Sequence, residues 1–137
     1  MPISTGFNHV ATLTTDMRRT VTFYEQVFDA VVTYEVQKSE HHPWMKIVDL
    51  GGGGALNIFE VDAADIIGER RSQAHRGAID HFAVAVDSRA TLEIVRERML
   101  GAGAEEVGEI QQLGSDWSLF YRDPDGMELE VCCAAES

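Results

Sequence analysis

The sequence predicts an α+β fold made of two copies of one β-α-β-β-β module, and two observations lead to this prediction. The same order of strand-like and helix-like patterns occurs along residues 5–61 and again along 78–134. Residues of the same type also occupy matching places in the two copies, at a shift of 71 to 73 positions. We therefore expect residues 1–137 to form a single domain, whose modules join in a curved mixed sheet around a cavity.

Alternating residues predict the strands of the first copy, and apolar residues at helical spacing predict its helix. Thr15 and Asp16 supply a cap signal before the helix, and the glycines at 51–54 turn the chain between two strands. The predicted strand, helix and three further strands span residues 7–14, 17–28, 31–36, 44–50 and 55–61. Residues 62–77 are predicted to form a short helix and a linker.

The second copy repeats this order. Asp87 and Ser88 form its cap signal, its helix ends at Gly101, and a turn at 123–126 precedes its last strand. The predicted strand, helix and three strands span residues 79–86, 90–100, 106–111, 117–122 and 127–132.

Specific residues of the two copies match in order. The pairs are Asn8-His9 with Asp80-His81, Asp16 with Asp87, Trp44 with Trp117, Gly53 with Gly126, and Asn57 with Glu130. Two copies related by an approximate two-fold axis place equivalent residues around that axis. We therefore expect His9, Asn57, His81 and Glu130 to converge.

Composition excludes several classes of partner. The net charge is −12, with 23 acidic residues against 11 basic ones, and this charge repels nucleic acid and anionic lipid. Apolar runs reach only about five residues, far short of a membrane span, and no leader pattern opens the chain.

Cys132 and Cys133 are adjacent on a predicted strand and point to opposite faces, so they do not pair. Unpaired thiols fit the reducing cytoplasm, where we expect the protein to act.

Two histidines and a carboxylate predict a metal site. Strand alternation puts His9 on one face of its strand beside Ala11, and His81 on the matching face beside Ala83. Glu130 completes a 2-His-1-carboxylate set, which leaves coordination positions open for substrate. This set suits Fe, Mn, Ni, Co or Zn equally, so it indicates a divalent metal without identifying the element.

Other residues are weaker candidates for the site. Asn57 occupies the place that matches Glu130 and is a possible fourth ligand or substrate contact, although its amide cannot act as a base. A shift of three positions would offer Glu60 instead, but on the opposite face of the strand. His41 and His42 are interpreted as solvated or rim residues, with substrate contact as the alternative. The two tryptophans either line the cavity or pack in the core.

The motifs resemble those of the vicinal oxygen chelate superfamily, which includes glyoxalase I, extradiol dioxygenases, fosfomycin-resistance enzymes and metal-free bleomycin-binding proteins. They are Asn8-His9-Val10-Ala11 with Asp16 and Phe23-Tyr24, Asp80-His81-Phe82-Ala83 with Asp87, and Asp123-Pro124-Asp125-Gly126 with Glu130. The resemblance implies a paired-module fold around a metal, with ligand positions at His9, Asn57, His81 and Glu130. Glyoxalase I has a glutamate where this chain has Asn57, which separates the chain from that enzyme.

The resemblance implies a metal-dependent lyase or isomerase of the glyoxalase type. Such an enzyme chelates neighbouring oxygens of a small metabolite and stabilises an enolate-like intermediate, with Glu130 as the catalytic ligand. A non-haem Fe(II) dioxygenase is the first alternative, and a drug-sequestering binding protein is the second. All three ligands are present, which argues against the binding protein. Relatives often pair, so we expect a homodimer.

Overall fold

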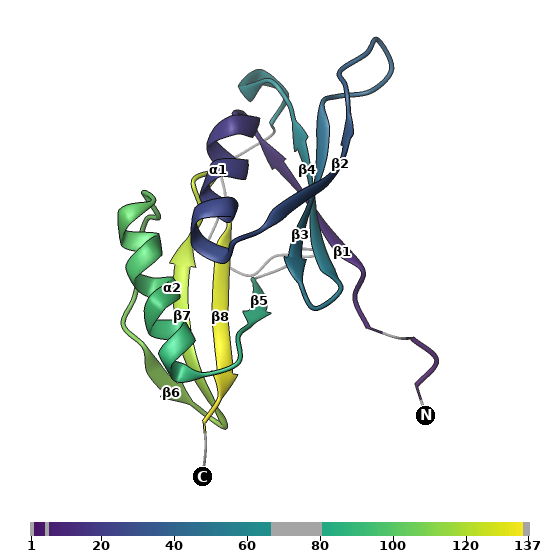
Figure 1. Cartoon of the computed structure of the whole chain (residues 1–137). Helices are drawn as coiled ribbons and strands as arrows, with labels where there is room; N and C mark the ends of the chain where they lie inside the picture. The colour runs from purple at the N-terminus through teal and green to yellow at the C-terminus, as the bar shows by residue number, and fades with distance from the viewer. Residues whose placement is uncertain (1, 5, 67–80, 136–137) are drawn as a thin grey trace. The chain divides into compact units, whose positions relative to one another are not determined.

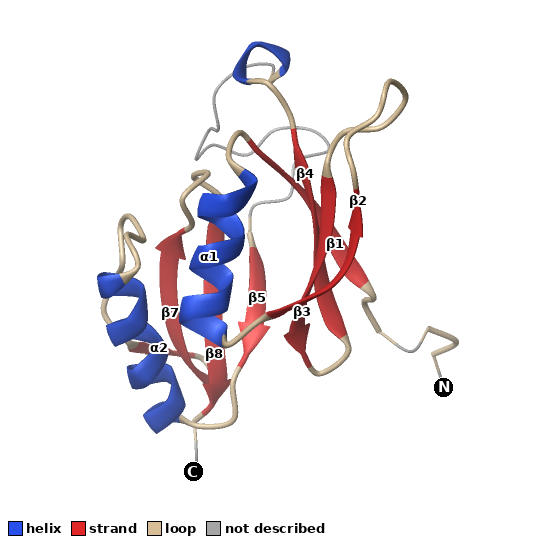
Figure 2. Cartoon of the chain, turned by 45° about the horizontal axis from the view of Figure 1, so that its top comes forward, coloured by secondary structure: helices blue, strands red, loops and turns tan. Residues whose placement is uncertain are grey.

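The structure is a computed structural model that describes residues 2–4, 6–66 and 81–135. The chain divides into two compact units, residues 1–67 and 68–137 (Figure 1). Within the described residues, each unit holds one four-stranded mixed sheet and one α-helix (Figure 2). The predicted α+β class and the repeated module are therefore confirmed, with the strands in two separate sheets.

The first unit follows the predicted order closely. Its strand order is β1-β4-β3-β2, in which β1 runs parallel to β4 and the other neighbours are antiparallel. Helix α1 packs on one face of the sheet, where Val48, Leu56 and Ile58 are at most 1 % exposed. The elements are β1 (His9–Thr14), α1 (Met17–Phe28), β2 (Val31–Val36), β3 (Met45–Gly51) and β4 (Gly54–Glu60).

The second unit has the same topology. Its strand order is β5-β8-β7-β6, and β5 again runs parallel to its neighbour β8. Helix α2 packs against β7 and β8, where Leu119, Leu129 and Val131 are fully buried. The elements are β5 (Phe82–Ala85), α2 (Arg89–Gly101), β6 (Gln111–Leu113), β7 (Asp116–Arg122) and β8 (Glu128–Ala134).

A capping side chain precedes each helix, and the positions of these two caps correct one of the residue pairs predicted to be equivalent in the repeat. Asp16 accepts a hydrogen bond from the backbone N–H of Arg19, and Ser88 accepts one from Thr91. Ser88 is therefore the equivalent of Asp16, whereas Asp87 was the predicted match. Asp87 lies one residue earlier and accepts a hydrogen bond from the Thr91 hydroxyl instead.

The strand predicted at 106–111 is wrong over most of its length. Glu106 has a φ of 51°, a left-handed conformation that interrupts an extended strand. The preceding residue, Glu105, exchanges both backbone hydrogen bonds with Arg122, and the Gly108 N–H donates to the Phe120 carbonyl. The chain thus follows β7 through a bulge, and regular pairing begins only at Gln111.

The segment between the modules is described only in part. A single 3-10 turn, Ala63–Asp65, represents the helix predicted within 62–77. The rest of that linker and the beginning of the strand predicted at 79–86, including Asp80, lie outside the described residues. In the part of the chain that the structure describes, neither α-helix is long and apolar enough to cross a membrane.

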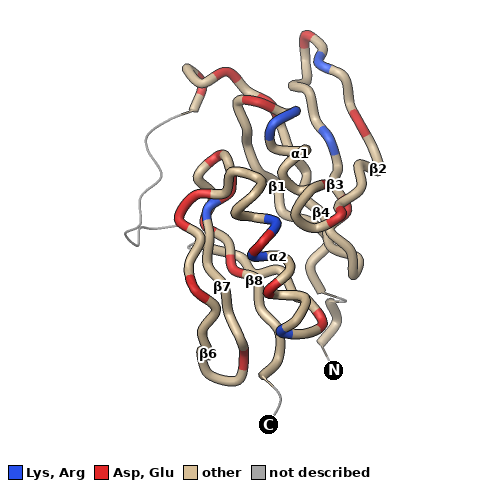
Figure 3. The backbone as a smooth tube through the Cα atoms, turned by 60° about the vertical axis from the view of Figure 1, so that its left-hand side comes forward, with Lys and Arg blue, Asp and Glu red and all other residues tan. Residues whose placement is uncertain are grey.

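Acidic residues are spread along both units rather than gathered in one segment. Figure 3 shows Asp and Glu on loops, strands and helices of each unit, with Lys and Arg placed among them. The acidic residues of the described segments are therefore distributed over both units and do not form one acidic run.

Candidate metal centre

In the second unit, one face of the sheet is covered by α2 and the other carries the predicted ligand. Glu130 on β8 pairs with Ala83 on β5 and with Phe120 on β7. Alternation along the strands turns these residues away from the face that α2 buries. Glu130 is therefore partly exposed instead of being packed in the core.

His81 and Glu130 come together on this face. Nε2 of His81 lies 3.2 Å from Oε1 of Glu130, and the side chains are 31 % and 15 % exposed. His81 directly precedes β5, and its ring meets the ring of Phe120 edge-on at a centroid distance of 5.3 Å. The imidazole is thus held in orientation by an aromatic ring and a carboxylate.

The separation of these two donor atoms fits a shared metal ion. Imidazole nitrogen and carboxylate oxygen bind transition metals at about 2.0–2.2 Å. Two such ligands at angles of about 90–110° are therefore about 3.0–3.4 Å apart. The observed 3.2 Å, which is a hydrogen-bond contact in this structure, lies within this range, so the separation of the two atoms is compatible with a shared metal ion.

The second oxygen of Glu130 has a partner that the sequence did not reveal. Ser118 on β7 donates its hydroxyl to Oε2 of Glu130 at 3.1 Å. Ser118 is 2 % exposed and lies on the same face as Glu130, because its register partner is Cys132, two residues further along β8. The available signal was one polar residue within the otherwise apolar run 117–121.

The first unit presents His9 and Asn57 on the corresponding face of its sheet. Asn57 on β4 pairs with Ala11 on β1, as Glu130 pairs with Ala83 in the second unit. His9 lies two residues before Ala11 and points to the same side. The predicted equivalence of Asn57 and Glu130 is therefore confirmed by strand register.

A hydrogen bond selects the nitrogen that His9 can offer. Nδ1 of His9 lies 2.8 Å from Oδ1 of Asn8, and an amide oxygen only accepts. Nδ1 therefore carries the proton in this contact, which leaves the lone pair of neutral His9 on Nε2. A partner of this kind is typical of metal-bound histidine. In the sequence, Asn8 belongs to the repeat and to the motif at residues 8–11, and neither of these predicts its contact with His9.

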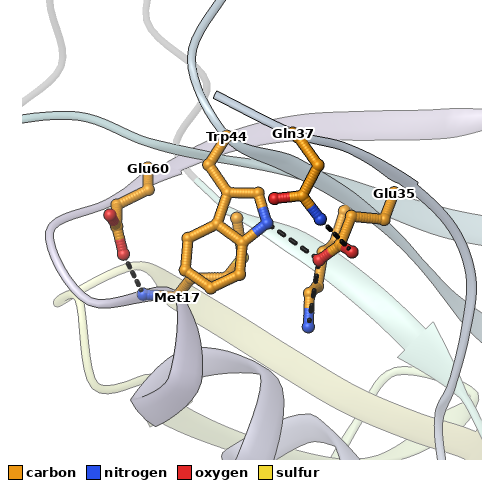
Figure 4. A network of polar contacts seen from close by, with 6 residues as sticks. Met17, Glu35, Gln37, Trp44 and Glu60 are labelled. Atoms are coloured by element: carbon orange, nitrogen blue, oxygen red, sulfur yellow. Dashed lines mark hydrogen bonds and ion pairs between the residues drawn. The ribbon is translucent and has the colours of Figure 1, made fainter. Parts of the chain in front are cut away.

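Glu60 has a structural role and does not replace Asn57. Its Oε2 accepts a hydrogen bond from the backbone N–H of Met17, the first residue of α1, at 2.9 Å (Figure 4). A carboxylate at a helix N-terminus satisfies an otherwise unpaired N–H group and interacts favourably with the helix dipole. As predicted, Glu60 faces the side of the sheet opposite to Asn57.

The tryptophans lie on the helix side of their sheets, which is the side opposite to Asn57 and Glu130. Trp44 donates its indole N–H to Glu35 at 2.8 Å (Figure 4). The ammonium group of Lys46 lies 5.3 Å from the centroid of the Trp44 ring. Trp117 alternates with Leu119 on β7, and the guanidinium of Arg89, from α2, lies 4.0 Å from its ring centroid.

The two cysteines point to opposite faces, as predicted. Cys133 is buried on the α2 side, whereas Cys132 lies on the face of Glu130 and is partly exposed. Burial raises the pKa of the Cys132 thiol, and the charges of Glu130 and Asp116 raise it further. The structure therefore favours the thiol over the metal-binding thiolate at Cys132.

His41 and His42 lie in the hairpin between β2 and β3. His41 is exposed, as interpreted from the sequence. His42 is half-buried, with Nδ1 2.6 Å from the Pro43 carbonyl oxygen and its ring 6.0 Å from that of Phe59. Among the contacts of the described residues, neither histidine has a neighbouring carboxylate with which it would form a pair of metal ligands.

The three predicted ligands are thus divided between the units. His81 and Glu130 form a pair in the second unit, and His9 belongs to the first. Over residues 2–4, 6–66 and 81–135, no group of three His, Cys, Asp or Glu side chains is close enough to hold a metal ion. The three-ligand site stays a prediction, and the described pair fits two of its positions.

Comparisons with known proteins agree with this fold. Residues 6–131 match the family model of the Glyoxalase/Bleomycin resistance protein/Dioxygenase superfamily. No curated protein is a significant match to the sequence. A glyoxylase/bleomycin resistance protein/dioxygenase domain from Frankia sp. EAN1pec is similar in structure, with a TM-score of 0.82, 24 % identity, and coverage of 98 % of this chain and 95 % of that one.

Two further crystal structures have the same fold. A glyoxalase family protein from Enterococcus faecalis is 24 % identical, with a TM-score of 0.70 and coverage of 93 % of this chain and 97 % of that one. A variant of the fosfomycin resistance protein FosX from Listeria monocytogenes, complexed with Mn(II) and 1S,2S-dihydroxypropylphosphonic acid, is 21 % identical, with a TM-score of 0.70 and coverage of 96 % and 93 %. At these identities the likeness establishes the fold alone.

Proposed function

Because the chain belongs to the Glyoxalase/Bleomycin resistance protein/Dioxygenase superfamily, we propose that it is a divalent-metal-dependent enzyme acting on neighbouring oxygens of a small metabolite. The observation that carries the proposal is the 3.2 Å approach of His81 Nε2 to Glu130 Oε1, at the separation expected of two ligands on one metal ion. The metal complex of FosX, a protein of the same fold, supports a divalent ion and an oxygen-rich ligand.

His9, His81 and Glu130 would hold the ion in this proposal. Two neutral imidazoles and one carboxylate leave a net charge of about +1 on a divalent ion, which favours an anionic pair of oxygens. A bound ion would act as a Lewis acid that stabilises negative charge developing on those oxygens. Glu130, the one ligand of this set that carries a charge, is also the proposed catalytic residue.

Asn57 restricts the reaction further. It occupies the register position of Glu130 in the other unit, but its amide has no basic lone pair near neutral pH. A mechanism that needs a second carboxylate as base at this position is therefore disfavoured. A lyase or isomerase reaction, in which the substrate or water supplies the proton acceptor, agrees with this donor set.

Metal analysis tests the proposal directly. Protein purified without chelator is expected to contain about one equivalent of divalent metal per chain, as a single three-ligand site requires. His9→Ala and His81→Ala should each lose most of this metal, whereas His41→Ala and His42→Ala should retain it. Retention of the metal by both ligand variants would overturn the proposed site.

Substrate assays with the Mn²⁺-loaded protein then test the reaction class. Fosfomycin and the hemithioacetal of methylglyoxal and glutathione are suitable first probes, because each presents neighbouring oxygen atoms on a small molecule. Turnover of the hemithioacetal that His81→Ala abolishes would support the lyase or isomerase class, whereas turnover of fosfomycin alone would indicate a metal-dependent opening of its epoxide instead. Turnover that is unchanged in His81→Ala would contradict a role for the metal.

A non-haem Fe(II) dioxygenase is the second candidate, because a set of two histidines and one carboxylate, without a carboxylate at Asn57, also fits this class. The same three ligands suit Fe(II) and leave positions for a substrate and for O2. Anaerobically loaded Fe(II) protein should consume O2 with a catechol if this candidate is correct. Inert behaviour under these conditions would exclude the candidate for catechol substrates.

The homodimer also belongs to the proposal. Light scattering during size-exclusion chromatography should give twice the chain mass of 15.2 kDa. A mass of one chain would contradict a stable dimer, and the metal analysis would be unaffected.

A further inference from the structure

The two oxygens of Glu130 have different partners within the second unit. Oε1 lies 3.2 Å from Nε2 of His81, and Oε2 lies 3.1 Å from Oγ of Ser118. One oxygen therefore faces the predicted metal position, while the other is engaged by the protein.

Ser118 is the donor in this contact. An ionised carboxylate only accepts hydrogen bonds, and a serine hydroxyl rotates to donate to it. Ser118 is 2 % exposed, so bulk water does not readily replace its hydroxyl. β7 and β8 pair directly, and the contact joins residues of successive cross-strand pairs on one face, Ser118 with Cys132 and Phe120 with Glu130, so its geometry is maintained by the sheet.

We propose that Ser118 is a positioning residue that holds Oε2 of Glu130, so that only Oε1 is presented to the metal. This inference rests on the proposed function. It makes Glu130 a one-oxygen ligand, whereas a carboxylate without such a donor can bind through both oxygens. When Glu130 binds through one oxygen, the metal ion keeps one more coordination position open than the two that a chelating substrate occupies.

A purely structural role for Ser118 predicts a different result. A buried hydroxyl needs a partner, and Ser118 would then contribute to stability without influencing the metal. A positioning role predicts a change in metal affinity and in the number of bound carboxylate oxygens. Mutation of outer partners of metal ligands typically weakens metal affinity by about 10–100-fold.

The test compares three variants by titration with Mn²⁺, with free Mn²⁺ measured by electron paramagnetic resonance. Ser118→Ala is expected to raise the Kd for Mn²⁺ by about 10–100-fold. Ser118→Thr keeps a hydroxyl and should restore most of the affinity. Ser115→Ala is the matched control, because Ser115 is exposed on the turn before β7, and its Kd should be unchanged.

X-ray absorption by the Zn²⁺-loaded protein provides a second measurement, and its result for wild type does not depend on the folding of any variant. Wild type should show a single carboxylate oxygen at the bonding distance, and Ser118→Ala should gain a second. Circular dichroism of the metal-free proteins should show that Ser118→Ala keeps its secondary structure.

The outcomes separate this inference from the proposed function. If wild type binds Mn²⁺ and His81→Ala does not, the proposed site stands. An unchanged Kd in Ser118→Ala, or two carboxylate oxygens in wild type, would then overturn the role of Ser118 alone. If wild type binds no divalent metal, both the site and the inference are wrong.

Discussion

Hydrogen bonds around each candidate ligand determine which atom it can offer to a metal. At His9 the decisive contact is between Nδ1 and Oδ1 of Asn8. Asn8→Ala removes the acceptor, so the ring can rotate or change tautomer, and the Kd for Mn²⁺ should rise by about 10–100-fold. Asn8→Asp keeps an acceptor and should bind Mn²⁺ within a few-fold of wild type. Equal affinity in Asn8→Ala and wild type would contradict this role.

Glu130 is expected to act through its charge and not only through its shape. Glu130→Gln keeps the size of the side chain and an oxygen that Ser118 can donate to, but it removes the negative ligand. Mn²⁺ affinity should fall by at least about 10-fold, as measured by the same titration. Glu128→Gln, on the same face of β8, is the control and should retain the affinity. Similar losses in both variants would indicate a general electrostatic effect.

At this scale the sequence could indicate the ligands but not their supporting partners. His9, His81 and Glu130 stood out because their types recur at equivalent places of the repeat. Ser118 did not, because its role depends on which residue of β8 lies diagonally opposite, and that is a consequence of strand register. Asn8 acts through the orientation of a side chain, and residue type does not specify that orientation.

The N-caps should contribute measurably to the stability of each helix. Asp16 accepts from the Arg19 N–H at 3.1 Å, and Ser88 accepts from the Thr91 N–H at the same distance. Asp16→Ala and Ser88→Ala should each lower the free energy of unfolding by about 1 kcal/mol in urea denaturation. Glu25→Ala, at an exposed position in α1, is the control and should change it by less than about 0.5 kcal/mol. Cap variants as stable as this control would contradict the assignment.

The beginning of α2 should also make stability dependent on acid pH. The hydrogen bond from the Thr91 hydroxyl, with a smaller contribution from Ser88, lowers the pKa of Asp87 below its ordinary value of 3.8. A lowered folded-state pKa adds stability that is fully present above the unfolded-state pKa and is lost as the pH falls through the folded one. The advantage of wild type over Asp87→Asn should therefore be constant from pH 7 to about 5 and shrink below about 4. Urea denaturation across this range measures it, and an advantage that grows toward acid pH would reverse the assignment.

Most elements could be predicted because local signals agreed with one another. Alternation, a cap residue and helical spacing define α1 without help from the rest of the chain, and its observed bounds agree with the prediction. The segment before β6 lacked that agreement. Its composition favours a strand, but Glu106 adopts a positive φ, and the chain bulges beside β7. This irregularity depends on pairing with β7, so no local pattern could indicate it.

At the scale of the whole chain, the repeat was the strongest signal. It predicted the topology shared by the two sheets, and strand register confirms the equivalence of Asn57 and Glu130. It also predicts that ligands from both units bind one metal ion. The contact between His81 and Glu130 lies within the second unit. Whether His9 of the first unit binds the same ion is the subject of the next experiment.

Thermal unfolding with Mn²⁺ tests whether the two units share that ion. An ion that binds only the folded protein stabilises it by about 2.7 kcal/mol at a concentration 100 times its Kd, and therefore raises Tm. If the first unit contributes a ligand, His9→Ala should lose most of the increase in Tm, as His81→Ala does. His42→Ala changes a half-buried histidine of the first unit outside the ligand set, so it should keep the full increase. A full increase in His9→Ala together with none in His81→Ala would assign the metal to the second unit alone. The exclusion of His9 would then leave His81 and Glu130 as the ligands, with more coordination positions open to substrate.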